Sequence, residues 1–195
     1  MKLILASASS ARAQILHNAG LEFGIEVAGV DEDALKVSLA GKEPATVARA
    51  LAEAKALAVS RNYPNVLVLG ADQVAVLDGA IRNKSRTMEE ARISLKEFRG
   101  GGHTLISAIC CAENGSIVFD HQETATLHMR AFSDGFLDEY LKRCGSDVLT
   151  SVGGYKIEGL GIQLFESIQG SHFTILGMPI LPLLDFLRGR GIVAA

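Results

Sequence analysis

Charged and hydroxyl side chains stand at the ends of apolar segments in the first half of the chain. Three serines and an arginine occupy residues 7–12 (S-A-S-S-A-R), between an apolar segment and an amphipathic one. Hydroxyl groups, the free backbone N–H groups of a helix start and the guanidinium of Arg12 together suit a phosphate group. Ordinary N-capping of a helix by Ser9 or Ser10 explains the same serines, so both interpretations stay open.

A single carboxylate, Asp72, ends the apolar run V-L-V-L-G-A-D at residues 66–72. A carboxylate in that position is costly unless it is paired, exposed at a sheet edge or bound to a metal ion. Ligands of open α/β sheets bind at strand ends, which favours a functional role for Asp72. A hydrogen-bonded structural aspartate is the competing interpretation.

Two lysines and an acidic cluster add candidates for phosphate and metal binding. Lys55 lies beside the apolar stripe of an alanine-rich segment, and Lys84 lies in a short polar loop. Taken singly, each is most often a solvated surface lysine. The acidic cluster V-D-E-D at residues 30–33 offers ligands for Mg²⁺, or it forms a solvated turn.

A glycine-rich segment, G-G-Y-K-I-E-G-L-G at residues 153–161, completes the candidates. Its glycines let a flat ligand approach the backbone, while Lys156 and Glu158 offer opposite charges. Cations for phosphates, carboxylates for a metal ion and a carboxylate for a base together suggest a nucleoside triphosphate site. Five scattered histidines have no metal-ligand spacing, and each is interpreted as a surface or satisfied core residue.

The elements that must position these residues alternate between strands and helices. Asp78-Gly79 and Asn114-Gly115 predict tight hairpin turns, and Thr87 with Glu90 predicts a capping box. Strands joined by hairpins within such an alternation predict an α/β fold with a mixed sheet. Buried strands are expected at residues 2–6 and 66–72, and helices at residues 10–19, 45–60 and 181–188, after Thr87 and after Ser133.

Composition excludes several classes of protein. The 195 residues carry 19 Lys+Arg against 22 Asp+Glu, a net charge of −3, which argues against a binder of duplex nucleic acid. Three cysteines without ligand spacing argue against a disulfide framework or a zinc site. The longest apolar stretch, residues 173–184, is interrupted by Pro179 and Pro182. We therefore expect a single domain over residues 1–195 in the cytoplasm, without a nucleic-acid or membrane partner.

Several short motifs, in order along nearly the whole chain, follow the pattern of one protein family. They are L-A-S-A-S-S-A-R (5–12) for L-A-S-x-S-P-R-R, G-A-D-Q-V (70–74) for G-A-D-T-V, N-K-S (83–85) for G-K-P, G-G-G-H (100–103) for G-R-x-H, V-G-G-Y-K-I-E-G (152–159) for A-G-A-Y-x-I-Q-G and G-M-P (177–179) for G-L-P. On these motifs the chain resembles the Maf family of nucleoside triphosphate pyrophosphatases nearly end to end. The resemblance implies the family's α/β fold, shared with inosine triphosphate pyrophosphatases: a long mixed sheet flanked by helices, with two lobes around a central cleft.

The same resemblance implies the roles of the charged residues. Asp72 is the catalytic acid/base or metal-binding carboxylate, Asp31 with Glu32 beside it is a second metal contact, and Lys55 and Lys84 neutralise the triphosphate. The implied reaction is attack of water on the α-phosphorus, which releases pyrophosphate and a monophosphate. Mg²⁺ or Mn²⁺ is the implied cofactor, because hard ions take oxygen ligands. The residues implied to line the phosphate site are Ser7, Ser9 and Arg12.

Departures from the family pattern bear on the choice of base. The paired arginines of the branch that acts on dTTP and UTP become Ala11-Arg12. Gln73 and Glu158 are similar to the branch that acts on 7-methyl-GTP, although that branch usually has tryptophan where Ala11 stands. One carboxylate accepts the adjacent N1–H and N2–H donors of guanine together, whereas it repels the carbonyl groups of uracil and thymine.

These observations predict a metal-dependent nucleotide pyrophosphatase that prefers 7-methyl-GTP or another modified purine. One alternative is a dTTP/UTP pyrophosphatase. Another, implied by the resemblance because the family is associated with cell-division arrest, is a nucleotide-binding regulator of septum formation. The altered N-K-S and G-G-G-H loops favour weak hydrolysis in that alternative. The nucleotide is the expected partner, and the resemblance is compatible with a homodimer.

Overall fold

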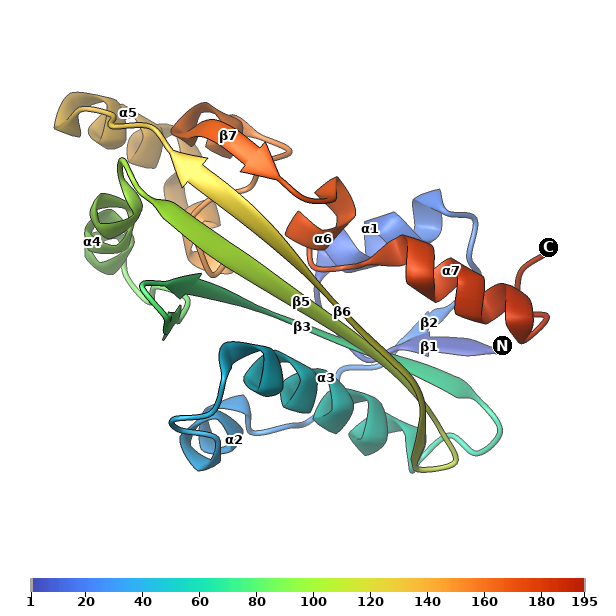
Figure 1. Cartoon of the computed structure of the whole chain (residues 1–195). Helices are drawn as coiled ribbons and strands as arrows, with labels where there is room; N and C mark the ends of the chain where they lie inside the picture. Colours follow the sequence, from blue (N-terminus) through green and yellow to red (C-terminus); the bar gives the residue numbers. More distant parts are fainter. Residues whose placement is uncertain (1, 195) are drawn as a thin grey trace. The chain divides into compact units, whose positions relative to one another are not determined.

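A seven-stranded mixed sheet runs through the computed structural model, which describes residues 2–194 (Figure 1). β1 pairs in parallel with β2 and β3, whereas β4 is antiparallel to β3 and β7 is antiparallel to β6. The expected α/β class with a mixed sheet flanked by helices is confirmed. The strand order is β2 (Gly24–Ile25), β1 (Leu3–Leu5), β3 (Leu67–Leu77), β5 (Gly102–Glu113), β6 (Ser116–Met129) and β7 (Phe165–Gln169), with β4 (Ala80–Arg82) paired to β3.

All five helices expected from the sequence are present. The α-helices are α1 (Ser10–Asn18), α2 (Glu32–Ser38), α3 (Pro44–Ser60), α4 (Met88–Phe98), α5 (Asp134–Cys144), α6 (His172–Ile175) and α7 (Ile180–Gly189), and the 3₁₀ helices are η1 (Gly145–Thr150) and η2 (Leu160–Leu164). The expected helices are α1, α3, α4, α5 and α7, whereas α2 and α6 are additional to those expected from the sequence. Within the described part of the chain, none of these helices has the length and apolar character needed to cross a membrane.

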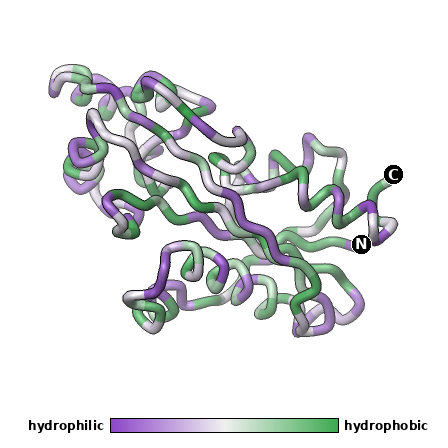
Figure 2. The backbone as a smooth tube through the Cα atoms, viewed as in Figure 1, coloured by the Kyte–Doolittle hydropathy of each residue, from purple (hydrophilic) through white to green (hydrophobic). Residues whose placement is uncertain are grey.

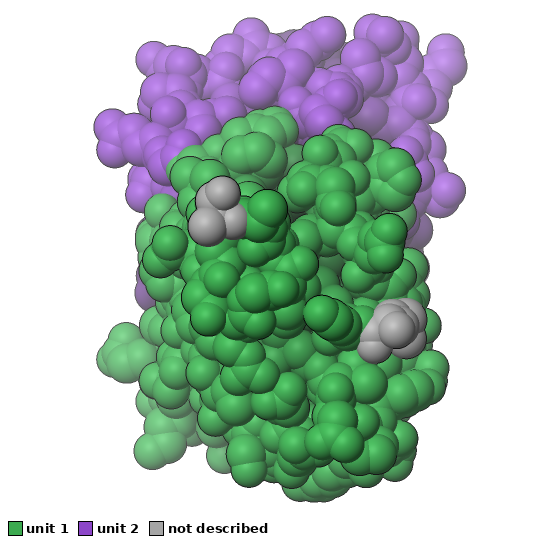
Figure 3. All heavy atoms as spheres, turned by 90° about the vertical axis from the view of Figure 1, so that its right-hand side faces the viewer, with its two compact units in different colours: residues 1–73, 106–124, 171–195 green, residues 74–105, 125–170 purple. Residues whose placement is uncertain are grey.

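The chain forms two compact units, shown in separate colours in Figure 3. Unit 1 consists of residues 1–73, 106–124 and 171–195, and unit 2 consists of residues 74–105 and 125–170. Strands β3, β5 and β6 contribute residues to both units. Each unit is therefore assembled from segments that are far apart in the sequence.

In unit 1, helices cover both faces of the parallel strands β1 and β3. Leu3, Leu5 and Leu69 pack with buried residues of α1 and α7, while Ile4 and Val68 pack with Val59 of α3 on the opposite face. Alternation of side chains along each strand produces this division. Both faces are thus apolar, and β1 is accordingly drawn in the hydrophobic colour in Figure 2. This explains why these strands are continuous apolar runs in the sequence.

The two predicted hairpin turns are confirmed by their backbone angles. Asp78 and Gly79 have φ values of 51° and 77°, and Asn114 and Gly115 have values of 51° and 75°. Positive φ at both central residues is the requirement of the type I′ turn, which matches the twist of antiparallel strands. The first turn connects β3 to β4, and the second connects β5 to β6.

The predicted capping box at the start of α4 is only half right. The Thr87 hydroxyl accepts a hydrogen bond from Glu90 N at 3.1 Å, as expected. The Glu90 carboxylate, however, accepts from Arg86 N at 2.7 Å rather than from the cap residue itself. Glu90 therefore holds the backbone of Arg86, the residue before the N-cap, and fixes the path of the chain into α4.

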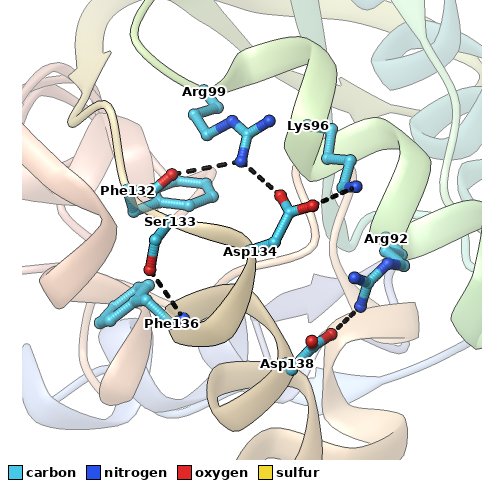
Figure 4. Close-up of polar contacts among 8 residues, drawn as sticks. All are labelled: Arg92, Lys96, Arg99, Phe132, Ser133, Asp134, Phe136 and Asp138. Atoms are coloured by element: carbon cyan, nitrogen blue, oxygen red, sulfur yellow. Dashed lines mark hydrogen bonds and ion pairs between the residues drawn. The ribbon is translucent and has the colours of Figure 1, made fainter.

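In unit 2, charged side chains link α4 to the start of α5 (Figure 4). Asp134 accepts hydrogen bonds from Lys96 Nζ at 3.0 Å and from Arg99 Nη1 at 2.6 Å, and Arg92 pairs with Asp138. The two hydrogen bonds from Lys96 and Arg99 lower the pKa of Asp134 below its ordinary value.

This lowered pKa predicts an acid-sensitive contribution to stability. A carboxyl group with a depressed pKa in the folded state stabilises the fold fully above its ordinary pKa of 3.8, and the contribution is lost as the pH falls through the lowered value. The variant Asp134→Asn should therefore melt at a lower temperature than wild type at pH 7. Melts repeated below pH 3.8 should show the difference narrowing; a difference that stays constant with pH would contradict this role for the ion pairs.

Candidate active site

The phosphate-loop candidates of residues 7–12 form a closed polar arrangement at the start of α1. Ser9 is the N-cap residue and accepts a hydrogen bond from Arg12 N at 3.4 Å. The Arg12 guanidinium donates to Ser7 Oγ at 3.2 Å, to Ala71 O at 2.8 Å and to Gly177 O at 3.0 Å. The capping interpretation of Ser9 is thus correct as far as its own hydroxyl is concerned. Arg12 in addition brings three distant segments of unit 1 together.

Arg12 keeps its positive charge in this setting. Burial lowers the pKa of Arg12 from its ordinary value, while the nearby carboxylates of Asp72 and Glu32 act in the opposite direction. Arginine nevertheless remains protonated in proteins under ordinary conditions, because its guanidinium charge is delocalised. The positive charge of Arg12 therefore lies at Ala71, the residue before Asp72.

Close packing of α3 on β3 brings Lys55 to Asp72. A Cβ atom at Gly70 would overlap Ala52 O and lie 2.7 Å from Ala56 N, so only glycine lets the helix approach the strand so closely. One helical turn beyond Ala52, the Lys55 ammonium donates to Asp72 Oδ1 at 2.6 Å. The glycine of the G-A-D motif therefore creates the pairing of two residues that are well separated in the sequence.

Lys55 joins Asp72 to a second carboxylate, that of Glu32. The Lys55 ammonium lies 2.6 Å from Asp72 Oδ1 and 2.9 Å from Glu32 Oε1. The side chains of Lys55 and Asp72 are only 11% and 9% exposed, whereas that of Glu32 is 43% exposed. Two carboxylates and one cation thus share one partly accessible site within unit 1.

The acidic residues 31–33 belong to a helix start rather than to a turn. Asp31 is the N-cap residue of α2, and its Oδ1 accepts from Ala34 N at 2.9 Å. Glu32 and Asp33 lie in the first turn, where negative charge is favoured by the helix dipole. The carboxylate that reaches Lys55 is therefore that of Glu32, while Asp31 Oδ1 is engaged in capping.

The donor set around Lys55 fits a hard divalent cation. Across residues 2–194, no group of three or more His, Cys, Asp or Glu side chains is arranged to hold a metal ion. Mg²⁺, however, is commonly bound by one or two carboxylates together with oxygens of substrate phosphates and water. Asp72 and Glu32 supply two such carboxylates.

The Gln73 side chain is bound to its own chain. Its Nε2 donates to Ser107 Oγ at 2.8 Å and to the carbonyl oxygens of Thr174 and Ile175 at 2.9 and 3.0 Å. The buried Ser107 hydroxyl also donates to Thr174 O at 2.7 Å. Gln73 therefore attaches β3 to α6, a role that its place after Asp72 does not reveal. The sequence signal for this network is a serine, Ser107, within the apolar run of β5.

The remaining candidates stand on the surfaces of their units. Ala11 lies in α1 and is half-buried in unit 1. Lys84 and Glu158 belong to unit 2, and both are exposed. Next to Glu158, the Lys156 ammonium pairs with Asp147 at 3.3 Å. The structure thus gathers Ser7, Ser9, Arg12, Lys55, Asp72 and Gln73 in unit 1, with Glu32 as an addition, and presents Lys84 and Glu158 on unit 2.

Several known proteins are similar to this chain over nearly its whole length. The family described as Maf-like protein matches residues 2–190. A protein of Granulibacter bethesdensis named nucleoside triphosphate pyrophosphatase is 50% identical over 190 residues, which cover 96% of each chain. A protein of Rhizobium meliloti named 7-methyl-GTP pyrophosphatase is 49% identical over 195 residues, which cover 99% of this chain and 98% of that one.

One solved structure is also similar at low identity. A HAM1 protein from Coxiella burnetii has a TM-score of 0.44 and 15% sequence identity, with 68% of this chain and 74% of that chain covered.

Proposed function

The chain belongs to the Maf family of nucleoside triphosphate pyrophosphatases, and from this premise we propose that it hydrolyses a nucleoside triphosphate with a preference for 7-methyl-GTP or another modified purine nucleotide. The observation that carries the proposed reaction is the cluster of Arg12, Lys55, Asp72 and Glu32 in unit 1. Cations and carboxylates in one partly buried site are the groups that phosphoanhydride hydrolysis requires.

In the proposed reaction, Asp72 accepts a proton from the attacking water. The water oxygen forms a bond to the α-phosphorus, and the bond from that phosphorus to the bridging oxygen of the β-phosphate breaks. Pyrophosphate and a nucleoside monophosphate leave. Lys55, 2.6 Å from Asp72 Oδ1, holds the carboxylate in place. Lys55 and Arg12 stabilise the negative charge that develops on the phosphate oxygens.

The residues proposed to hold a divalent cation are Asp72 and Glu32. A divalent cation such as Mg²⁺ or Mn²⁺, if held by these two carboxylates, would neutralise phosphate charge and lower the pKa of a water bound to it. The carboxylate of Asp31, also expected to contact the metal, has one oxygen engaged by Ala34 N. Glu32 is the better second ligand in this arrangement, because its carboxylate shares the Lys55 ammonium with Asp72 and so lies close to that residue.

Glu158 is proposed to select the base. Its exposed carboxylate has room for a ligand, and carboxylate oxygens accept the N1–H and N2–H donors of guanine as a pair. The positive charge that N7-methylation places on the base adds an electrostatic attraction. Gln73 takes a supporting role instead, because its amide nitrogen already donates to Ser107 and α6.

The proposal predicts that Glu158→Gln changes the preference among nucleotides. A well-placed bidentate contact to a base is worth about 10- to 100-fold in discrimination, so the kcat/KM ratio of 7-methyl-GTP to UTP should fall by that order. Pyrophosphate release with Mg²⁺ or Mn²⁺ across 7-methyl-GTP, GTP, UTP, dTTP, CTP and ITP measures the ratio. The exposed Glu139 of α5 provides a control, because Glu139→Gln makes the same charge change elsewhere on unit 2.

Three outcomes of this panel are decisive. Preference for 7-methyl-GTP in the wild type, lost in Glu158→Gln, supports the proposal. Preference for UTP or dTTP in the wild type would retain the reaction and overturn the choice of base. Tight binding without turnover of any nucleotide would overturn the reaction itself.

A further inference from the structure

A buried histidine in unit 2 has no part in the proposed reaction and yet keeps a polar group inside an apolar cluster. His103, near the start of β5, is 2% exposed. Its ring lies 4.5 Å from the Phe98 ring and 6.0 Å from the Phe165 ring, measured between centroids. Within residues 2–194, its Nδ1 atom is buried without a hydrogen-bond partner. A buried polar atom left unpaired destabilises the fold, so the histidine calls for a reason other than packing.

The polar contact that His103 does make is with Tyr155. His103 Nε2 and the Tyr155 hydroxyl share a hydrogen bond of 2.6 Å, and both side chains are buried. Burial lowers the pKa of His103 to about 4, so the ring is neutral at physiological pH. The contact is therefore a short hydrogen bond between neutral groups in an apolar surrounding, where such bonds are strong.

Tyr155 belongs to the glycine-rich segment 153–161, which is fixed at several points. Tyr155 N donates to Ser151 Oγ at 3.0 Å, and the Tyr140 hydroxyl of α5 donates to Gly154 O at 3.0 Å. The segment is thus held by α5, by the preceding Ser151 and, through the Tyr155 hydroxyl, by β5.

The segment is also packed without spare room. A Cβ atom at Gly153 would lie 2.7 Å from Tyr155 Cζ, and one at Gly161 would lie 2.8 Å from Lys156 N. Ile157 is buried as well, whereas the next residue, Glu158, is exposed. The exposed carboxylate of Glu158 therefore follows two buried side chains, those of Tyr155 and Ile157, which anchor this part of the segment.

We infer that His103 is a positioning residue for specificity: through the Tyr155 hydroxyl it fixes the segment that presents Glu158 to the nucleotide base. The inference rests on the proposed function, because the position of Glu158 affects specificity only if its carboxylate selects the base. It assigns His103 and Tyr155 to the choice of substrate and leaves the chemical step to the residues of unit 1.

The test compares variants that remove the shared hydrogen bond with one that can restore it. Tyr155→Phe deletes one oxygen and keeps the buried ring, and His103→Leu removes the imidazole. Loss of one hydrogen bond should lower the kcat/KM ratio of 7-methyl-GTP to UTP by about 2- to 10-fold, mainly through a higher KM for 7-methyl-GTP. His103→Gln, which can again bond to the hydroxyl, should recover much of the ratio. Tyr63→Phe in unit 1 is the matched control and should leave the ratio unchanged.

A merely structural role is separated from a positioning role by combining variants. In a Glu158→Gln background, Tyr155→Phe should have no further effect on the ratio, because the group it positions is gone. An equal loss for both nucleotides in Tyr155→Phe, or a further fall in the ratio in the double variant, would overturn the inference. If Glu158→Gln shifts the ratio and Tyr155→Phe does not, the inference fails alone. If the wild type shows no purine preference, the proposed specificity fails and the inference with it.

Discussion

Asp72→Asn should lower the rate of pyrophosphate release by about 10²- to 10⁴-fold, the usual contribution of a general base. The amide has the shape of the carboxylate but neither its negative charge nor its capacity to take a proton from water. Lys55 retains an ion pair with Glu32, 2.9 Å away, so the variant should fold. Pyrophosphate release with the best wild-type nucleotide, in Mg²⁺ or Mn²⁺, measures the effect.

The control for this variant is Asp185→Asn on the exposed side of α7. It makes the same change in unit 1 away from the cluster, and it should leave the rate within experimental error of wild type. Release by Asp72→Asn at the wild-type rate would remove Asp72 from the reaction. If Asp72→Asn is inactive because it does not fold, Asp72→Glu is the less disruptive test, since it keeps the negative charge and changes only the geometry.

Local chemistry explains why most elements could be predicted from the sequence. The apolar runs of β1 and β3 and the turns at Asp78-Gly79 and Asn114-Gly115 depend on neighbouring residues alone, and they occur where expected. The short helix α2 is not expected from the sequence, because residues 30–33 are equally typical of metal ligands or of a solvated turn. An aspartate followed by two acidic residues is also the pattern of a capped helix start, which the structure has there.

Contacts between distant segments explain why the site could be predicted only in part. The sequence indicates Asp72 through its place at the end of an apolar run, but the pairing with Lys55 depends on how closely α3 packs over Gly70. Likewise, the place of Gln73 after Asp72 does not indicate that its amide nitrogen donates to carbonyl groups of α6. The resemblance implies two lobes, but the segments that make up each unit could not be predicted, because each unit draws on parts of the chain that are far apart in the sequence.

Lys55→Met should destabilise the protein by about 3–5 kcal/mol, the usual result of removing one partner from a buried ion pair. Methionine fills a volume similar to the lysine stem, so little packing is lost. The Asp72 carboxylate, 9% exposed, is left without the cation that lies 2.6 Å from its Oδ1 atom. Chemical denaturation of the variant and of wild type measures the difference. Lys42→Met, at an exposed position, should change stability by less than about 0.5 kcal/mol.

The double variant Lys55→Met/Asp72→Asn separates charge from packing. Removing the carboxylate along with the ammonium eliminates the uncompensated buried charge, so the double variant should regain most of the lost stability. It should remain inactive, because both the proton acceptor and a phosphate-binding cation are absent. A Lys55→Met protein as stable as wild type, or a double variant no more stable than Lys55→Met, would mean that the ion pair contributes little to the fold. Lys55, which lies between Asp72 and Glu32, would then contribute to the reaction and not to stability.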